Sequence, residues 1–507
     1  MTTHEEHLER EVKLGAWPGF RLPELDDIRE GLSASPPTEQ RLEATYYDTP
    51  DARLARSGAS LRFRTGDGTG WTLKLPDGDG VAPGGGLSRR ELTFPGDGKA
   101  VPPAVETLLA AWVRTSSLVP VARLATHRRA VRLVDEEGSP QAEVVDDEVS
   151  VLHGRRVAVR FREVEAEAAP DAPDDLLPEV VARLRAAGAG PPDPTSKVRR
   201  ALGPLAAGPP ELAPVELGPA PTAGDAFRAA FTASVLRLLG HDLGVRLGEA
   251  PEDVHQARVA TRRLRSDLKT YGDLLDPAWA GELRTDLKDV ASALGAVRDA
   301  DVLLGRLRGR LASLRDDDAP AAERLLSTLE DERREDRRTL LELLASDAYR
   351  ALLDRLVEGA RNPQLTALAG QPAAAVLTEL ARGPWQKLRA AARRVEPGGA
   401  DEELHQVRIR AKRARYAAEV AALAVGRPAQ RFAKAVAKLQ DGLGELQDAV
   451  VAEAWLRSAA AGAPRPVVLA AGQLVAMERA DAERARGSWR DAWRAVRKPS
   501  VRSWLTT

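Results

Sequence analysis

The chain has 507 residues, of which 43% are hydrophobic and 29% charged, and its formal net charge is −1. A chain of this length is expected to form two to four domains, and its balanced charge argues against a protein that binds nucleic acid over its whole surface. It has no cysteine, which excludes disulfides and thiolate metal sites. The polar, acidic start and the lack of an apolar run of about 18 residues favour a cytoplasmic protein without a membrane span.

Residues 1–203 alternate short extended stretches with turns rich in glycine, proline and aspartate, as in "ASLRFRTGDGTGWTLKLPDGDG". Turns about every ten residues predict an antiparallel all-β domain, to which helices over 101–113 and 174–187 are added. Residues 204–221 are rich in proline and glycine and have no periodicity, so we predict a linker there.

In this β domain, charged residues recur at every second position of five predicted strands. Alternate side chains of a strand share one face, so these charges lie either on a wetted face or in an interior. One such strand alone is most often solvent-exposed, but here acids are grouped on the first and last strands and bases between them, which is typical of a binding site. The residues are Glu9, Glu11 and Lys13; Arg62 and Arg64; Lys74; Arg89 and Glu91; and Glu163, Glu165 and Glu167.

Charges inside a small closed barrel would each cost several kcal/mol unless they were paired or bound ions. Carboxylates are suitable ligands for Mg²⁺ or Mn²⁺, and lysine and arginine donate hydrogen bonds to phosphate. Metal and basic residues around a polyanion are the recurring solution for phosphoryl transfer. The pattern therefore predicts a tunnel for a metal-bound, phosphate-rich small molecule.

The opening Glu-x-Glu-x-Lys is followed in order by "YYDTPDARLARSGASLRFR", "TLKLP", "SRRELTF", "VVDDEVSVLHG", "REVEAE" and "SKVRRAL". This series resembles the CYTH family, the triphosphate tunnel metalloenzymes, over residues 4 to about 203. The resemblance implies an eight-stranded antiparallel tunnel, with accessory helices, that hydrolyses or rearranges triphosphates with a divalent metal, Mg²⁺ or Mn²⁺.

The same resemblance assigns roles to individual residues. Metal-side carboxylates are expected at Glu9, Glu11, Asp147, Glu163 and Glu165. Triphosphate-binding bases are expected at Lys13, Arg62, Arg64, Lys74, Arg89, Arg129 and Lys197. Glu9, Glu11, Lys13 and Lys74 are the expected catalytic residues. Arg128 is the alternative to Arg129, and Glu91 fits an acidic position without an assigned role.

From residue 222 to about 500, apolar residues recur at helical spacing, which predicts an all-α domain. "VHQARVATRRLRSDLKTY" from Val254 resembles "LHQVRIRAKRARYAAEV" from Leu404, and "LGAVRDADV" from Leu294 resembles "LGELQDAVV" from Leu443. An offset of about 150 residues predicts a duplicated helical bundle. We expect two pseudo-symmetric antiparallel bundles that share a face, over about 222–362 and 372–500.

Each copy carries a basic helix whose His, Arg and Lys residues lie at offsets 0, 3, 7 and 10, on one narrow stripe. A solvated face is the commonest alternative, but acidic partners one turn away are scarce and both copies keep the stripe. The histidines are interpreted as ligands to an anion rather than a metal, because no second histidine lies one turn away. The stripes are His255, Arg258, Arg262 and Arg265, and His405, Arg408, Lys412 and Arg415.

The stripes and the repeated motifs resemble the CHAD domain, the conserved-histidine α-helical domain, over residues 222 to about 500. The resemblance implies binding of long-chain inorganic polyphosphate on a basic surface formed by both bundles, with an affinity that falls as salt rises. Nucleic acid is a weaker expectation, because no aromatic residues for base stacking are interleaved with the stripes.

We therefore expect a metal-dependent hydrolase that converts inorganic triphosphate to diphosphate and phosphate. Its helical domain would tether it to polyphosphate, in the cytoplasm or on polyphosphate granules. Two alternatives stay open. One is an adenylyl cyclase, or a thiamine or nucleoside triphosphatase, on the same fold. The other is a non-catalytic polyphosphate-binding or targeting protein whose tunnel only grips chain ends.

Overall fold

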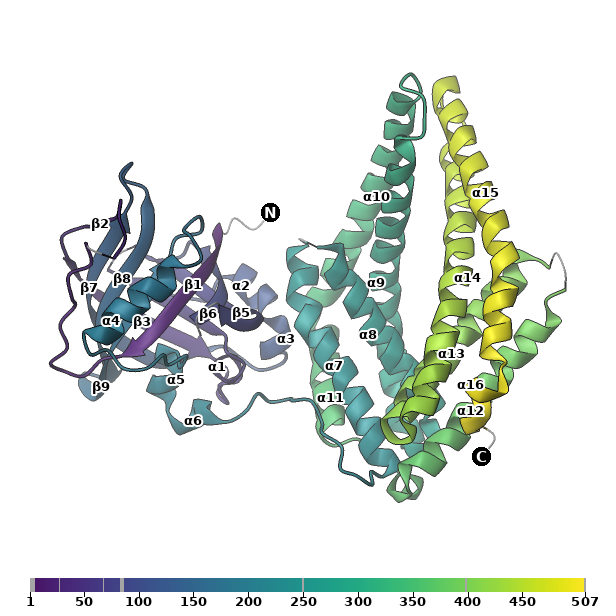
Figure 1. The fold of residues 1–507 in the computed structure, drawn as a ribbon. Helices are drawn as coiled ribbons and strands as arrows, with labels where there is room; N and C mark the ends of the chain where they lie inside the picture. The colour runs from purple at the N-terminus through teal and green to yellow at the C-terminus, as the bar shows by residue number, and fades with distance from the viewer. Residues whose placement is uncertain are drawn as a thin grey trace. The chain divides into compact units, whose positions relative to one another are not determined.

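The computed structural model describes residues 5–26, 28–66, 68–82, 86–248, 250–396 and 399–505 (Figure 1). The chain divides into two compact units, Met1–Glu211 and Leu212–Thr507. This division falls inside the predicted linker, whose first residues form a short helix, α6 (Pro204–Ala207), that contacts the first unit. In the described part of the chain, no helix is long and apolar enough to span a membrane.

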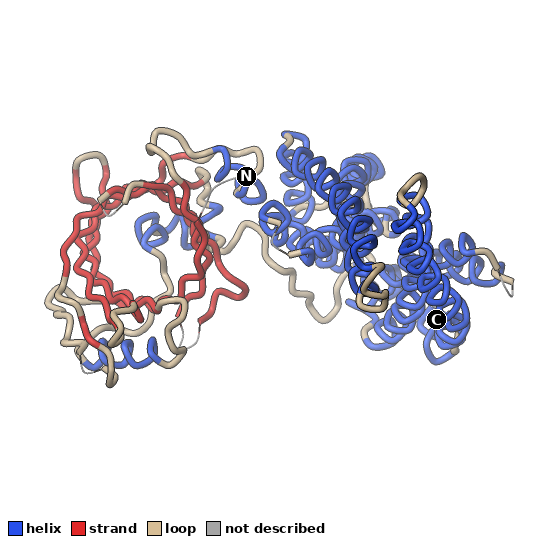
Figure 2. Tube along the Cα trace, turned by 90° about the horizontal axis from the view of Figure 1, so that it is seen from above, coloured by secondary structure: helices blue, strands red, loops and turns tan. Residues whose placement is uncertain are grey.

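The first unit is a closed antiparallel barrel, as predicted. Its strands are β1 (Glu5–Gly15), β3 (Thr38–Asp48), β4 (Ser60–Thr65), β5 (Gly70–Ala82), β6 (Gly86–Phe94), β7 (Val119–Val134), β8 (Pro140–His153) and β9 (Arg156–Ala168). They pair in the order β7-β3-β4-β5-β6-β1-β9-β8, and pairing of β7 with β8 closes the ring (Figure 2). The two-residue strand β2 (Ser33–Ala34) pairs with β7 outside this ring.

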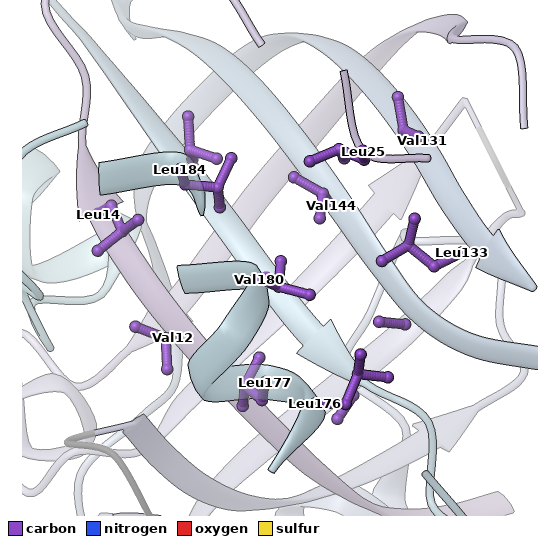
Figure 3. Close-up of a cluster of buried hydrophobic side chains, with 14 of the residues drawn as sticks. Val12, Leu14, Leu25, Val131, Leu133, Val144, Leu176, Leu177, Val180 and Leu184 are labelled. Atoms are coloured by element: carbon purple, nitrogen blue, oxygen red, sulfur yellow. The ribbon is translucent and has the colours of Figure 1, made fainter. Parts of the chain in front are cut away.

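The main apolar core of the barrel lies outside its wall. On β1, Val12 and Leu14 point outward and are fully buried, whereas Lys13 between them points into the barrel. The outward apolar residues of β1, β7, β8 and β9 pack against helix α4 (Leu176–Ala186), which buries Val180 and Leu184 on them (Figure 3). Because this outer layer supplies much of the hydrophobic stabilisation, much of the interior can carry charge.

A second apolar cluster lies around the short helix α5 (Lys197–Leu202), which follows α4 in the chain. The hydroxyl of Ser196 accepts a hydrogen bond from the Arg199 amide and caps this helix. Val198 packs against Ala44 and Leu124, while Lys197 lines the charged cavity. The unit also contains the short helices α1 (Arg53–Arg56), α2 (Pro103–Leu108) and α3 (Ala110–Val113). Helices α2 and α3 confirm the predicted helical segment 101–113, and α4 confirms the segment 174–187.

The second unit is all-α. Its helices are α7 (Ala223–Leu247), α8 (Pro251–Thr270), α9 (Pro277–Leu311), α10 (Ala319–Ala345), α11 (Asp347–Arg361), α12 (Ala373–Arg394), α13 (Asp401–Val425), α14 (Arg427–Ala459), α15 (Arg465–Val496) and α16 (Pro499–Arg502). The first begins with a capping box, in which Thr222 and Asp225 each bond the other's backbone amide.

The predicted duplication is visible in how these helices pack. Helices α7–α10 contact one another in sequence, and α12–α15 do the same. Corresponding helices of the two copies also meet: α7 contacts α12, α8 contacts α13, α9 contacts α14 and α10 contacts α15. The two basic helices of the stripes, α8 and α13, therefore lie side by side between the copies.

Candidate functional site

The barrel encloses a cavity of about 180 Å³ whose lining is mostly charged. Each strand contributes the residues that alternate with its outward apolar residues: β1 contributes Glu9 and Lys13, and β4 contributes Arg62 and Arg64. The alternation read from the sequence therefore marks the inner face of the barrel. Further lining residues are Lys74, Arg89, Glu91, Arg128, Glu143, Glu165, Glu167 and Lys197.

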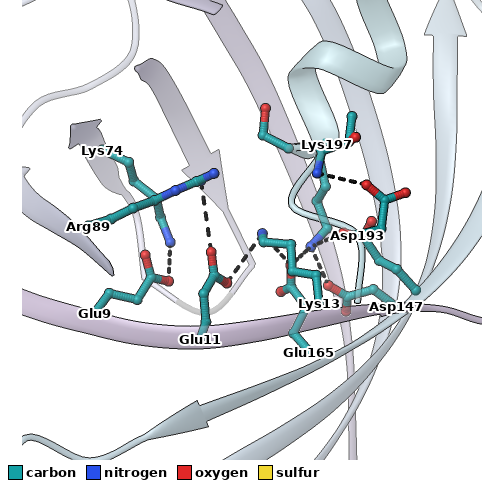
Figure 4. A network of polar contacts seen from close by, with 12 residues as sticks. Glu9, Glu11, Lys13, Lys74, Arg89, Asp147, Glu165, Asp193 and Lys197 are labelled. Atoms are coloured by element: carbon teal, nitrogen blue, oxygen red, sulfur yellow. Dashed lines mark hydrogen bonds and ion pairs between the residues drawn. The ribbon is translucent and has the colours of Figure 1, made fainter. Parts of the chain in front are cut away.

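The lysines of the cavity are held by carboxylates from two or more strands (Figure 4). Lys13 Nζ lies 2.6 Å from Glu165 and 3.2 Å from Glu11. Lys74 contacts Glu9 and lies 2.7 Å from Glu91. The acids grouped on the first and last strands are thus paired with the bases between them, which offsets the cost of burying them.

Lys197 holds a second group of acids together. Its Nζ lies 2.9 Å from Asp147, 2.8 Å from Glu163 and 2.9 Å from Glu165. The side chains of Asp147 and Glu163 are completely buried. Burial opposes the charge on Lys197, but Asp147 and Glu163 hold its pKa well above the usual value for lysine. All of these predicted site residues are therefore brought together inside the barrel.

The ionisation of the carboxyl groups differs along the cavity. Burial opposes the charge of Glu91, but Lys74 and Arg62 outweigh it and lower the pKa of Glu91 to about 2. Burial also opposes the charge of Glu9, yet Lys74 keeps the pKa of Glu9 below its usual value. Burial raises the pKa of Glu11, to which the neighbouring Glu9 carboxylate contributes. The cavity thus holds carboxylates of different proton affinity within one network.

The acids on β1 and β9 leave oxygen atoms unused. Glu9 Oε2 and Glu11 Oε1 are buried without a hydrogen-bond partner. The two carboxylate oxygens of Glu163 are also buried, and their neighbours are the charged groups of Lys197 at 2.8 Å and Arg200 at 3.5 Å. Buried carboxylate oxygens that accept no hydrogen bond suit a divalent cation, which takes oxygen ligands. In the described part of the chain, no three such groups converge closely enough to hold a metal ion.

Glu167 belongs to this acidic group, although the family resemblance assigned it no role. It pairs in register with Glu11 across β1 and β9 and lines the cavity. Burial raises the pKa of Glu167 to about 8, and the nearby Glu9 carboxylate adds to the shift. The signal was present in the sequence, because Glu167 continues the alternation of Glu163 and Glu165. Glu143 and Tyr46 also line the cavity and carried no such signal.

The structure corrects one assignment. Arg129 points out of the barrel, where it contacts Glu39 at 3.2 Å and is 42% exposed. Arg128 lines the cavity and donates two hydrogen bonds to Asp147. Adjacent residues of a strand face opposite sides, so only one of these two arginines can reach the interior, and it is Arg128.

The other predicted bases lie inside the barrel. Arg62 and Arg64 line the cavity beside Tyr46, and Nε of Arg62 is buried without a hydrogen-bond partner. Arg89 is 7% exposed, and its guanidinium lies 3.8 Å from Glu11. Arg62 and Arg89 are held less tightly by acids than the lysines are, so their guanidinium groups are available as donors to a bound anion.

The helical unit carries a second site, which we call the histidine cavity. It has a volume of about 460 Å³ and lies between α8, α9, α13 and α14. Six predicted stripe residues line it: His255, Arg258, Arg262, His405, Arg408 and Lys412. The two stripes thus face one shared cavity.

The repeated second motif holds the stripe arginines. Arg258 Nη1 lies 2.8 Å from Asp299, and Arg408 lies 3.9 Å from Asp448, the equivalent residue of the second copy. His405 Nδ1 lies 2.5 Å from Gln447 Oε1.

The two copies differ beside the histidines. Arg298 occupies the position in the first copy that Gln447 occupies in the second. Burial lowers the pKa of His255, and the positive charge of Arg298 lowers it further. Both effects favour the neutral form of His255.

Two stripe residues lie apart from the other six. Arg265 lines a different cavity, and Arg415 contacts Glu419 and the ring of Tyr416. The reason is the length of the stripe: at about 1.5 Å rise per residue, offset 10 lies about 15 Å along the helix axis from offset 0. The last residue of each stripe therefore lies beyond the histidine cavity.

The CYTH domain family matches residues 8–200, and the CHAD domain family matches residues 229–457. The uncharacterized protein Rv2226 of Mycobacterium tuberculosis (strain ATCC 25618 / H37Rv) is 33% identical over 484 residues, which cover 89% of this chain and 88% of that protein. Two solved structures are also similar. PptA from Streptomyces chartreusis is 26% identical over 54% of this chain and 99% of its own, with a TM-score of 0.46. The CHAD domain from the plant Ricinus communis is 26% identical over 58% and 95%, with a TM-score of 0.43.

Proposed function

The chain belongs to the family in which a CYTH domain is followed by a CHAD domain, and from that premise we propose that it hydrolyses inorganic triphosphate to diphosphate and phosphate. One observation carries the proposal. The barrel encloses a small cavity in which carboxylates with unused oxygens lie beside lysines and arginines. That combination suits a metal-bound chain of phosphates and little else of that size.

The CYTH family uses divalent metal ions. The residues that would hold one here are the predicted acids Glu9, Glu11, Asp147, Glu163 and Glu165, together with Glu167, which pairs in register with Glu11. A bound Mg²⁺ or Mn²⁺ would neutralise phosphate charge and lower the pKa of a bound water. For the chain's own residues, Lys13, Lys74 and the cavity arginines would donate to phosphate oxygens. They would thereby stabilise the charge that develops on the departing diphosphate.

The cavity lysines form ion pairs with carboxylates, and these ion pairs would have to change when substrate and metal bind. Lys13 and Lys74 are paired with the carboxylates that a metal would take. A triphosphate offers these lysines new partners, so it can release the carboxylates without leaving a buried charge unpaired.

Two alternatives act on the same fold. Nucleoside and thiamine triphosphates carry an aromatic ring, and among the described lining residues of the cavity the only aromatic rings are those of Tyr46 and His7. This favours inorganic triphosphate over adenylyl cyclase or organic triphosphatase activity. The remaining alternative, a non-catalytic protein that grips chain ends, shares the same charged lining and differs only in turnover.

A substrate panel tests these functions together. Phosphate release from triphosphate, ATP and thiamine triphosphate is measured with Mg²⁺ and with Mn²⁺, and cyclic AMP is assayed with ATP. Fastest turnover of triphosphate supports the proposal. Cyclic AMP formation would establish the cyclase instead, and tight triphosphate binding without turnover would establish the non-catalytic protein.

We also propose that the helical unit binds inorganic polyphosphate through the histidine cavity and its surroundings. The support is the duplicated set of cations around one cavity, because a repeating anion can bind both copies at once. Nothing in this surface requires a membrane, and we propose that the protein acts in the cytoplasm or on polyphosphate granules. Retention on immobilised polyphosphate, with elution by salt, tests the binding.

A further inference from the structure

A second cavity of the helical unit lies where the two copies meet, between α8, α12 and α13, and we call it the seam cavity. Its volume is about 850 Å³. Arg262 and Lys412, one from each copy, line both the seam cavity and the histidine cavity. The two cavities therefore share a wall at the contact of α8 with α13.

The seam cavity has more unneutralised positive charge than the histidine cavity. Six of its lining residues are cations that have no ion-pair partner among the residues the structure describes: Arg265, Lys269, Arg284, Lys387, Arg410 and Arg413. Proximity to Arg413 is the largest of several effects that lower the pKa of Lys269. Two acids also line the seam cavity, Asp273 and Glu379, of which Glu379 pairs with Arg382. In the histidine cavity, Asp299 and Asp448 pair with the stripe arginines Arg258 and Arg408.

The wall of the seam cavity also contains unpaired hydroxyl groups. Tyr416 is 1% exposed, and its hydroxyl has no hydrogen-bond partner within the described chain. The hydroxyl of Ser266, on the opposing helix α8, is likewise buried and unpaired. A buried hydroxyl without a partner costs about 1–3 kcal/mol, and both groups can donate to a phosphate oxygen.

Taken together, the unpaired cations and hydroxyl groups make the seam cavity suitable for binding an anion. Repulsion among the cations is relieved only when negative charge enters. An extended ligand is required, because the cations come from α8, α9, α12 and α13 and surround a large volume.

We propose that the seam cavity, rather than the histidine cavity, is the tighter seat for an inorganic phosphate chain. This inference rests on the proposed polyphosphate binding and assigns it to residues outside the two histidine stripes. The chain would run from the seam cavity past Arg262 and Lys412, with the histidine cavity as its weaker continuation.

The test compares two arginines of the same helix, α9. Arg284 lines the seam cavity and Arg298 lines the histidine cavity, so Arg284→Gln and Arg298→Gln remove the same charge at the two places. Binding of sodium polyphosphate to the full-length protein is measured by titration calorimetry at several salt concentrations. We expect Arg284→Gln to weaken binding about five- to tenfold and to reduce the magnitude of the slope of log K against log salt by about 0.7. Arg298 lies in the weaker continuation of the site, so we expect Arg298→Gln to weaken binding by only about two- to threefold.

A variant that removes a hydroxyl group without changing the net charge distinguishes the contribution of hydrogen bonding from that of charge. Tyr416→Phe keeps every charge, so we expect about three- to tenfold weaker binding with an unchanged salt slope. The proposal is overturned if Arg298→Gln is the more damaging arginine change, or if Tyr416→Phe and Arg284→Gln both bind like the unaltered protein. Failure of the unaltered protein to bind polyphosphate would instead refute the proposed function itself.

Discussion

Arg128 and Asp147 form a two-point ion pair inside the barrel, across the paired strands β7 and β8. Arg128 Nε lies 2.9 Å from Oδ1 of Asp147, and Nη2 lies 2.7 Å from Oδ2. The next residue, Arg129, reaches Glu39 on the outside of the same wall. Two consecutive arginines of one strand therefore lie in different environments: Arg128 lies in the candidate active site, and Arg129 lies on the outer surface of the barrel.

This arrangement predicts opposite results for two neighbouring substitutions. Hydrogen bonds to charged groups contribute about 1.5–3 kcal/mol, so Arg128→Gln is expected to lower kcat/KM for triphosphate about 10- to 100-fold. Arg129→Gln removes an exposed ion pair and should leave kcat/KM within twofold. Steady-state phosphate release measures both variants, and a larger loss for Arg129→Gln would contradict the register of β7.

The same pair shows what the sequence could and could not predict. Alternation of charge identified the barrel and its inner residues, because period two is a property of any strand with two unlike faces. It could not choose between Arg128 and Arg129, since both are basic and a shift of one residue reverses the face. Only the pairing of Arg128 with Asp147 across β7 and β8 decides it.

The helical unit shows a similar limit. The histidine motif located six of the residues around one cavity, because they lie on two repeated helices. Arg284 and Lys387 of the seam cavity were not predicted, since they come from α9 and α12 and belong to no repeated motif. Their proximity depends on tertiary packing between the copies, which local periodicity does not encode.

The unused oxygens of the acidic group predict a loss of metal binding when one ligand is removed. Glu9→Gln replaces a buried carboxylate whose Oε2 has no partner, so we expect Mn²⁺ affinity and triphosphate turnover to fall at least about 100-fold. Glu6, on the same strand, contacts Arg90 at the surface, and Glu6→Gln is the matched control. Equal Mn²⁺ affinity in the two variants, measured by calorimetry, would exclude Glu9 as a ligand.

The position of the core outside the barrel wall predicts that stability depends on α4. Leu184 of this helix is fully buried against the outward faces of the strands. Leu184→Ala should therefore lower the free energy of unfolding by about 2–5 kcal/mol, although it changes no charge in the cavity. Arg185→Ala, at an exposed position of the same helix, should change it by less than about 0.5 kcal/mol. Urea denaturation of the two variants measures the difference; equal stabilities would mean that α4 does not support the barrel.

Lys412 predicts how polyphosphate binding depends on pH. Burial lowers the pKa of Lys412 to about 7, and Arg408, Arg262 and Arg258 add to this, while Asp299 opposes it. Without a ligand, the amine therefore loses its proton as pH rises through about 7. A bound polyanion favours the protonated form, so binding above this pH takes up a proton. Affinity should fall as pH rises from 7 to 9, by up to about tenfold per unit.

Replacing Lys412 by arginine distinguishes the titration of Lys412 from a pH effect that arises elsewhere in the protein. The position equivalent to Lys412 in the first copy is Arg262, which stays protonated throughout this range. Lys412→Arg should therefore keep the affinity seen at pH 6.5 and remove most of its decline up to pH 9. Calorimetry in buffers of different ionisation enthalpy counts the proton taken up, which should be near one for the unaltered protein at pH 8 and near zero for Lys412→Arg. If both proteins take up the same number of protons, the pH dependence arises elsewhere, with His255 the next group to replace.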